Sequence, residues 1–202
     1  MTRRAVFLDR DGTLNELVPD PHTGNPESPL RPQDVRLVPG AASAVRSLAE
    51  AGWMLVGVSN QPAAAKGATS VAALHSVQER VVELLAAEGA LVDDFRLCLH
   101  HPEGSVAELT LDCQCRKPRP GMLLEAASEH GIALAESWMV GDTDADVLAG
   151  HAAGCRAALI DNPGSAHKRT GAASPDLIVA TLSEAAAEIL RVGQSLPWPN
   201  AR

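Results

Sequence analysis

The stretch Ala5-Val6-Phe7-Leu8-Asp9-Arg10-Asp11-Gly12-Thr13-Leu14-Asn15 decides the fold of this chain. Its first four residues form a short apolar run, which is typical of a strand buried on both faces of a parallel sheet. The run ends at two carboxylates, and ligands of open α/β sheets bind beyond the carboxyl ends of the strands. There Asp9 can attack phosphorus, and Asp11 can transfer protons to and from the reacting oxygens. An ordinary Asp-Gly turn would leave the same short pattern, so the rest of the chain must discriminate between the two.

The composition indicates one globular domain with a sizeable core. The chain has 202 residues, of which 46% are hydrophobic and 21% charged. A net charge of −8 and an aromatic content of 2% argue against a nucleic-acid partner, which needs basic patches and stacking platforms. A small phosphorylated substrate stays compatible with this charge, because a bound divalent cation reverses the local sign.

The N-terminus carries no recognisable targeting pattern. Only four apolar residues follow Arg3 and Arg4 before Asp9, which is too short a run for a signal peptide. No stretch approaches the roughly 20 apolar residues of a membrane helix. We therefore expect a cytoplasmic monomer without membrane contact, in which cysteines stay reduced and a cysteine cluster binds metal.

Strand-like and helix-like patterns alternate along the chain. The expected strands are 5–8, 53–58, 94–99, 137–140, 156–160 and 177–180, and the expected helices are 41–51, 70–88, 120–130, one ending at 153, and 182–192. This alternation predicts an α/β fold with a doubly wound, Rossmann-like parallel sheet. A single domain would cover 1–192, followed by a tail, 193–202, without periodicity.

The segment 16–39 interrupts the alternation. It contains six prolines and shows neither a helical nor a strand period. Long connections of this kind in compact domains are binding loops, lids or disordered insertions. Because the segment directly follows the two carboxylates, we expect a loop that faces the substrate, with a disordered insertion as the alternative.

Polar residues also mark the later strand ends. Ser59, Asn60 and Gln61 follow the second expected strand, and Asp142 follows the fourth. Lys117 lies on a loop just before a helix. Phosphoryl transfer needs positioning and charge neutralisation more than covalent chemistry, and these groups supply both. Each alone is compatible with a turn, a surface charge or an acidic helix start; their combination predicts a phosphoryl-transfer site.

Two short cysteine motifs predict a metal site. Cys98-x-His100 and Cys113-x-Cys115 offer three thiolates and one imidazole, the donor set of many structural zinc sites. His101 competes with His100 as the imidazole ligand. The alternative is a buried strand cysteine with two unrelated loop thiols.

The order D-x-D-G-T, S-N, K-P and G-D-x-x-x-D resembles the four motifs of the haloacid dehalogenase-like phosphatases. The resemblance implies a capless fold of that superfamily and an Mg²⁺-dependent phosphomonoesterase acting on a small phosphorylated substrate. By this resemblance Asp9 is the nucleophile and Asp11 the general acid/base. Phosphoryl and substrate binding fall to Ser59, Asn60 and Gln61, and Lys117 balances the charge. Mg²⁺ would be bound by Asp9, the backbone carbonyl of Asp11, and Asp142. Asp146 would have a supporting role.

The cysteine motifs, together with the Arg116-Lys117-Pro118 that follows them, resemble the D-glycero-D-manno-heptose-1,7-bisphosphate 7-phosphatases and the related histidinol-phosphate phosphatases. The resemblance covers residues 5–161 and implies a structural Zn²⁺ in the loop 98–115. It implies that the protein removes the 7-phosphate of the heptose bisphosphate. A remote phosphate of the substrate would need cationic partners, and Arg116 and Lys66 are the candidates. The alternatives are a histidinol-phosphate phosphatase, a broad small-molecule phosphatase and a non-catalytic zinc-loop module.

The chain departs from the family pattern in three places that bear on the substrate. The loop after the first motif is longer and rich in proline. The stretch 60–67 reads Asn-Gln-Pro-Ala-Ala-Ala-Lys-Gly, where the family has Asn-Gln-Ser-Gly-Ile-Ala-Arg-Gly. Thr143 stands where the heptose enzymes have a lysine.

Overall fold

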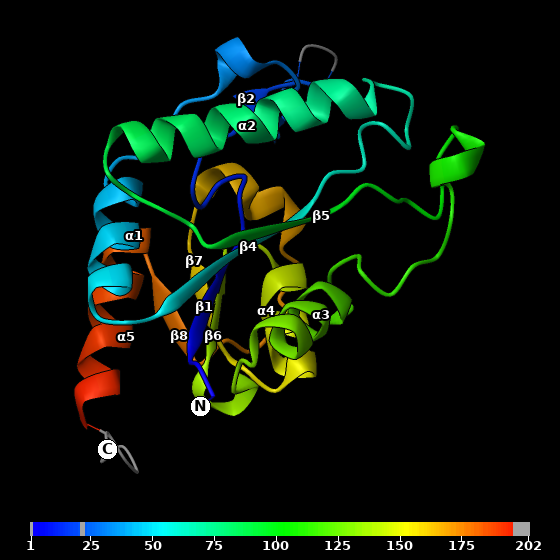
Figure 1. Cartoon of the computed structure of the whole chain (residues 1–202). Helices are drawn as coiled ribbons and strands as arrows, with labels where there is room; N and C mark the ends of the chain where they lie inside the picture. The colour runs from blue at the N-terminus through cyan, green and yellow to red at the C-terminus, as the bar shows by residue number, and fades with distance from the viewer. Residues whose placement is uncertain (1, 21–22, 196–202) are drawn as a thin grey trace.

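The computed structural model describes residues 2–20 and 23–195, and its centre is a six-stranded sheet (Figure 1). All neighbouring strands of this sheet pair in parallel. In spatial order the strands are β5 (Asp94–Cys98), β4 (Met54–Asn60), β1 (Ala5–Leu8), β6 (Trp138–Gly141), β7 (Arg156–Ile160) and β8 (Leu177–Val179). The predicted doubly wound parallel sheet is confirmed.

Helices cover both faces of the sheet. One apolar cluster joins the sheet to α1 (Ala41–Glu50), α2 (Val71–Ala87) and α5 (Leu182–Ser195), and another joins it to α3 (Gly121–His130) and α4 (Asp144–Ala153). Figure 1 shows α1 and α5 on one side of the strands and α3 and α4 on the other. Short 3₁₀ turns lie at Pro32–Asp34, Ala107–Leu109, Leu134–Glu136 and Pro163–Lys168.

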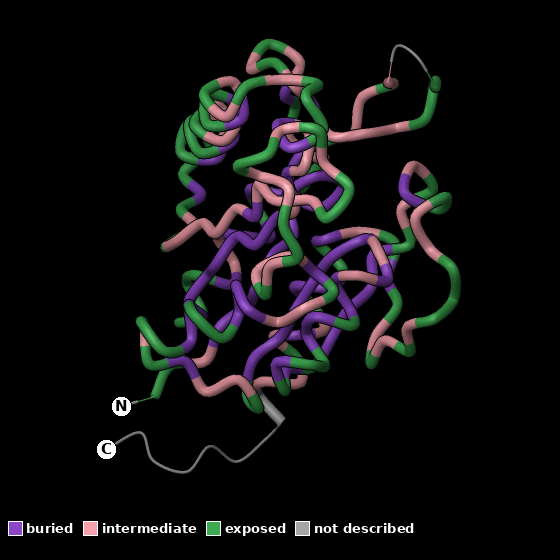
Figure 2. The backbone as a smooth tube through the Cα atoms, turned by 90° about the vertical axis from the view of Figure 1, so that its right-hand side faces the viewer, coloured by how far each residue is buried: buried purple, intermediate pink, exposed green. Residues whose placement is uncertain are grey.

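The first strand explains why its sequence is continuously apolar. Val6 and Leu8 pack into the cluster with α1 and α5, whereas Ala5 and Phe7 pack into the cluster with α3 and α4. All four are fully buried, because successive side chains of a strand point to opposite faces and both faces are covered here. Figure 2 shows the same concentration of buried residues through the middle of the molecule.

The strand order places a binding crevice between β1 and β6. From β1 the chain moves outward to β4 and β5, and it then returns to β6 on the other side of β1. Ligands of doubly wound sheets bind where the strand order reverses, beyond the carboxyl ends of the strands. Asp9 follows β1 and Asp142 follows β6, so both lie at this point.

The structure moves two predicted boundaries by more than one residue. β4 continues to Asn60 because Ser59 and Asn60 keep pairing with Leu97 and Cys98 of β5. Helix α5 runs to Ser195, which makes the first three residues of the predicted tail helical. Residues 196–202 lie outside the described part of the chain.

The Pro-rich segment contains a small hairpin that the sequence did not predict. β2 (Val18–Pro19) pairs antiparallel with β3 (Pro26–Glu27). Each strand has only two residues, because proline has no N–H to extend a hydrogen-bonded ladder. The base of the segment is tied to the sheet end, since Val38 donates its N–H to the carbonyl of Leu14 at 3.0 Å.

Among the described helices, none combines the length and the apolarity that crossing a bilayer requires.

Candidate active site

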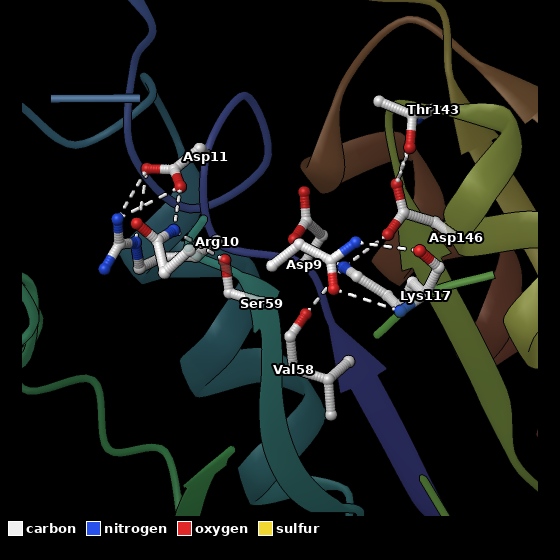
Figure 3. A network of polar contacts seen from close by, with 10 residues as sticks. Asp9, Arg10, Asp11, Val58, Ser59, Lys117, Thr143 and Asp146 are labelled. Carbon is white, nitrogen blue, oxygen red and sulfur yellow. Dashed lines mark hydrogen bonds and ion pairs between the residues drawn. The ribbon is translucent and has the colours of Figure 1, made fainter. Parts of the chain in front are cut away.

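A buried lysine joins the ends of three structural elements. Lys117 Nζ donates to Asp9 Oδ1 at 2.7 Å, to the carbonyl oxygen of Val58 at 2.7 Å, and to Asp146 Oδ1 (Figure 3). Only 4% of the lysine is exposed. An ammonium has three donors, so these contacts use all of them and fix the charge beside the predicted nucleophile.

Asp146 holds this lysine from the start of α4. Its Oδ2 accepts hydrogen bonds from the N–H and the hydroxyl of Thr143, at 3.0 and 2.6 Å, while its Oδ1 faces Lys117. Gly141 makes room for the carboxylate, because a Cβ there would lie 2.3 Å from Asp146 Cγ. Both oxygens of Asp146 are therefore engaged, which agrees with the supporting role expected of it.

Three buried carboxylates gather around one point. Oxygens of Asp9, Asp142 and Asp146 lie within 4.8 Å of one another. Asp142 Oδ1 is buried without a hydrogen-bond partner among the described residues. Gly12, at φ +87°, brings the backbone so close that a Cβ there would lie 2.0 Å from Asp142 Oδ2. A buried carboxylate oxygen without a hydrogen-bond partner, among other carboxylates, is a suitable ligand for a small divalent cation that prefers oxygen.

The electrostatics of this cluster favour a bound cation. Burial and the charge of Asp146 together raise the pKa of Asp9 to about 7, against the opposing charge of Lys117. Burial likewise raises the pKa of Asp142 to about 8, with Asp9 and Asp146 adding to the effect. A cation between Asp9 and Asp142 would relieve this repulsion and favour the ionised carboxylates.

Asp11 occupies a different position from the three gathered acids. Its Oδ1 accepts from Asn15 Nδ2 at 2.9 Å and its Oδ2 from Gln61 Nε2 at 2.5 Å, and Arg10 donates to both oxygens. Burial alone would raise the pKa of Asp11, but Arg10 and the hydrogen bonds from Asn15, Gln61 and Ser28 hold it below its usual value. The side-chain carboxylate of Asp11 therefore lies at the edge of the site. The resemblance assigned only the backbone carbonyl of Asp11 to the metal.

The residues at the end of β4 have distinct contacts. Gln61 Nε2 also donates to Ser59 Oγ at 2.9 Å, so the serine keeps its own O–H to donate. Asn60 accepts from the N–H of Lys117 at 3.0 Å and donates to its carbonyl at 2.9 Å. The Asn60 amide therefore holds the backbone of the lysine, a role that the sequence did not indicate.

Asn162 is another residue that the sequence analysis missed. Its Nδ2 donates to the carbonyl of Gly12 at 3.1 Å and lies 3.4 Å from Asp142 Oδ2. It follows β7 in the way that the predicted residues follow their strands, and this position is the signal that could have identified it. Asn162 links the loop after β1 to the carboxylate after β6.

The four predicted zinc ligands lie together. The three thiol sulfurs of Cys98, Cys113 and Cys115 are 3.2 to 3.5 Å apart, and His100 Nδ1 lies 3.4 Å from Cys115 Sγ. All four ligand atoms lie within 4.8 Å of one another. Three thiols and an imidazole converging on one point fit tetrahedral zinc. His101 lies outside the cluster, because its Nδ1 accepts the N–H of Glu103 at 3.1 Å.

The cysteine cluster is joined directly to the active site. Cys115 precedes Lys117 by two residues, and the intervening Arg116 donates to the carbonyl of His100 at 3.4 Å. Gln114 accepts the N–H of Gly121 at the start of α3, at 3.0 Å. A metal in the cluster would therefore fix the segment that carries the buried lysine.

A cavity of about 1120 Å³ borders this site. The Pro-rich segment lines one side of it, and the loop after β4, including Gln61 and Lys66, lines the other. Lys66 and Arg116 lie near His101: burial lowers the pKa of His101, and the two positive charges lower it further. The Pro-rich segment thus borders the same cavity as the end of β4, next to a group of cationic side chains.

Acidic groups and a buried lysine at the switch point of a doubly wound parallel sheet define the class of haloacid dehalogenase-like phosphatases. The HAD-hydrolase-like family model matches residues 114–185. A D-glycero-D-manno-heptose-1,7-bisphosphate 7-phosphatase from Thermosynechococcus vestitus is 39% identical over 92% of this chain and 94% of its own length. A D-glycero-beta-D-manno-heptose-1,7-bisphosphate 7-phosphatase from Yersinia pestis is 37% identical over 89% of this chain and 92% of its own length. The chain belongs to this 7-phosphatase family, as the sequence motifs predicted.

A solved structure agrees with this membership. The D,D-heptose 1,7-bisphosphate phosphatase from B. bronchiseptica, complexed with magnesium and phosphate, matches with a TM-score of 0.77. It is 27% identical to this chain, and the match covers 94% of this chain and 99% of that protein. Family membership makes the chain a phosphoric monoester hydrolase and removes the support for a non-catalytic zinc-loop module.

The first prediction concerns zinc. Protein purified without chelator should contain one zinc ion per chain, because the four ligands already converge. The double variant Cys113→Ser/Cys115→Ser should lose the metal by elemental analysis. His101→Ala is the matched control and should keep it. Zinc-free wild-type protein, or full zinc retention in the double variant, would contradict the assignment.

The second prediction concerns magnesium and pH. In the folded state the pKa values of Asp9 and Asp142 rise from 3.8 to about 7 and about 8. The folded chain therefore binds more protons than the unfolded chain in this window, and stability without a cation falls as pH rises through it. Mg²⁺ needs the ionised carboxylates, so its stabilising effect grows in the same direction.

Thermal unfolding should therefore show a larger Mg²⁺-induced rise in Tm near pH 8 than near pH 5. At an Mg²⁺ concentration of 100 Kd the stabilisation would be about 2.7 kcal/mol. Asp142→Asn should abolish most of the rise at both pH values. An equal rise at both pH values in the wild type would show that these carboxylates do not hold the ion.

Proposed function

We propose that this protein is an Mg²⁺-dependent phosphatase that removes the 7-phosphate of D-glycero-D-manno-heptose 1,7-bisphosphate through a phosphorylated Asp9. The observation that carries the proposal is the buried contact of Lys117 with Asp9, beside the unpartnered oxygen of Asp142. This arrangement offers a nucleophile together with two means of neutralising phosphate charge. The names of the curated relatives support the choice of substrate.

In the first step, an Asp9 oxygen attacks the phosphorus of the 7-phosphate. The bond from phosphorus to the sugar oxygen breaks, and its electron pair goes to that oxygen, which takes a proton from Asp11. Lys117 neutralises charge on the phosphoryl group, and the hydroxyl of Ser59 donates to one of its oxygens. Asp11 must be protonated in this step. Arg10 and the hydrogen bonds to Asp11 favour its ionised form in the free chain, so the proton has to be taken up when the anionic substrate binds.

In the second step, water attacks the phosphorus of phosphorylated Asp9 and gives a proton to the Asp11 carboxylate. The bond from phosphorus to Asp9 breaks, which releases inorganic phosphate and restores the nucleophile. The net reaction is hydrolysis of one phosphate ester by one water molecule, with Asp11 returned to its protonated form.

The residues that would hold Mg²⁺ are Asp9, Asp142 and the backbone carbonyl of Asp11. When bound, the ion supplies positive charge to the phosphoryl oxygens and orients the ester. Zinc in the cluster of Cys98, His100, Cys113 and Cys115 has a structural role, because protein ligands fill all four positions.

Two cationic side chains near the cavity support a bisphosphate as the substrate. Lys66 and Arg116 are available to bind the remote 1-phosphate. Histidinol phosphate would need acidic partners there, and the candidates are Glu16, Asp20 and Glu27. Of these, Glu27 is engaged by Lys168 at 2.6 Å and by His167 at 3.6 Å. Asp20 likewise accepts two hydrogen bonds from Thr23.

A single chain supplies every group in this proposal: the nucleophile, the acid/base, the lysine and the carboxylates. We accordingly propose that the enzyme acts as a monomer. Light scattering on the purified protein tests the monomer directly, and a dimer would contradict it.

The third prediction tests the nucleophile. Asp9→Asn should reduce turnover to the background rate, because an amide cannot form the acyl phosphate and is a poor metal ligand. The variant should keep its fold by circular dichroism, since the amide can still accept a hydrogen bond from Lys117. Substantial Mg²⁺-dependent phosphate release by folded Asp9→Asn would overturn the mechanism.

The fourth prediction tests the substrate. The value of kcat/KM should be higher for heptose 1,7-bisphosphate than for histidinol phosphate. Arg116→Ala should lower it about 10- to 100-fold for the bisphosphate, as expected for one lost charge-assisted hydrogen bond. Heptose 7-phosphate, which lacks the remote phosphate, is the matched control and should show little change. A preference for histidinol phosphate would refute the substrate assignment, and an unaffected Arg116→Ala would refute the role of the arginine.

A further inference from the structure

Arg10 is buried at the end of β1 and has no assigned role. None of its surface is exposed. Its Nε and Nη2 lie 3.2 and 3.1 Å from Asp11 Oδ1, and Nη2 lies 3.0 Å from Asp11 Oδ2 (Figure 3). Its Nη1 donates to Gln78 Oε1 on α2 at 3.3 Å. The guanidinium thus connects the expected acid/base to the helix that lies over the carboxyl ends of the strands (Figure 1).

Stability alone does not explain this arginine. A buried ion pair gains about as much from attraction as it loses through desolvation, and apolar replacements are often neutral or stabilising. The planar fork of a guanidinium does fix the orientation of a carboxylate, which a lysine or an apolar side chain does not. Since Arg10 contacts both oxygens of Asp11, it determines where that carboxylate points.

The position that Arg10 imposes lies next to the phosphoryl-binding group. Gln61 Nε2 lies 2.5 Å from Asp11 Oδ2 and 2.9 Å from Ser59 Oγ. The carboxylate is therefore separated from the serine hydroxyl by one shared hydrogen-bond donor. A shift of about 1 Å in a reacting group can lower a rate by about 10²-fold, so anchoring at this place bears on the chemistry.

We propose that Arg10 is a positioning residue for Asp11, anchored by Gln78, and that it serves the proton-transfer steps and not phosphate binding. The inference rests on the proposed function, because it takes Asp11 as the general acid and base.

Rapid mixing with p-nitrophenyl phosphate tests the inference on the full chain with Mg²⁺. Nitrophenolate is a good leaving group and leaves without a proton, so attack by Asp9 does not need Asp11. Release of phosphate from Asp9 does need it, because the attacking water must lose a proton. Asp11→Asn should therefore give a stoichiometric burst of nitrophenolate, followed by slow turnover, with phosphorylated Asp9 visible by intact mass.

Arg10→Met should give the same pattern. We expect a burst of wild-type amplitude, a steady state slower by about 10²-fold, and an unchanged KM. The double variant Arg10→Met/Asp11→Asn should be no slower than Asp11→Asn, because both changes disable the same group. Arg10→Lys should recover only part of the rate, since lysine lacks the fork.

The outcomes separate the possible failures. A reduced burst with normal turnover per active site would mean that Arg10 is merely structural, and it would overturn the inference. A burst in Asp11→Asn with wild-type turnover in Arg10→Met would overturn the inference alone. If Asp11→Asn gives no burst and keeps wild-type turnover, the acid/base assignment itself fails.

If Arg10→Met does not fold, Gln78→Leu tests the inference instead, because it removes the side chain that anchors Arg10. Gln78 is half-buried on α2 and accepts its hydrogen bond from Arg10. Its loss should slow the steady state several-fold at full burst amplitude, and unchanged turnover would overturn the inference. Glu79→Gln, on the exposed side of the same helix, is the matched control and should behave as the wild type.

Discussion

The rest of the site depends on the ammonium of Lys117, which lies buried between Asp9 and Asp146. Burial alone would lower the pKa of this lysine, but the two carboxylates raise it above its ordinary value and keep it charged. Without that charge, three carboxylates would face one another in a region that excludes water. The same ion therefore permits the acidic residues to be buried and prepares the nucleophile for an anionic ester. Stability and chemistry cannot be separated at this point.

The sequence was a good guide wherever the position of a residue along a strand determined its role. Asp9 and Asp142 were identified because they follow apolar runs, and parallel strands bring their carboxyl ends to one edge. Cys98 and Cys113 were identified by their spacing from neighbouring donors. These features depend on the backbone, whose path follows from periodicity. The doubly wound sheet was predictable for the same reason, whereas the family was predicted from the resemblance of the motifs.

Side-chain orientation was not predictable from the sequence. Asp11 turns away from Asp9 toward Arg10, and Asn60 uses its amide on the backbone of Lys117. Both choices depend on partners that packing brings together from distant parts of the chain. Arg10 lies between two aspartates, a position that is typical of a charged residue at the surface. Nothing nearby in the sequence indicates that α2 covers it. The hairpin of the Pro-rich segment was missed because strands of two residues are too short to show a period.

The Pro-rich segment has a consequence for how the cavity is formed. Proline restricts the unfolded chain, so ordering a segment that contains six prolines loses less conformational entropy than ordering an equally long flexible loop. One wall of the cavity is made from a segment that has little conformational freedom to lose. Substrate binding need not first order that wall, which leaves more of the interaction energy for affinity. Replacing prolines of this segment with glycines should therefore weaken substrate binding although none of them is a catalytic group.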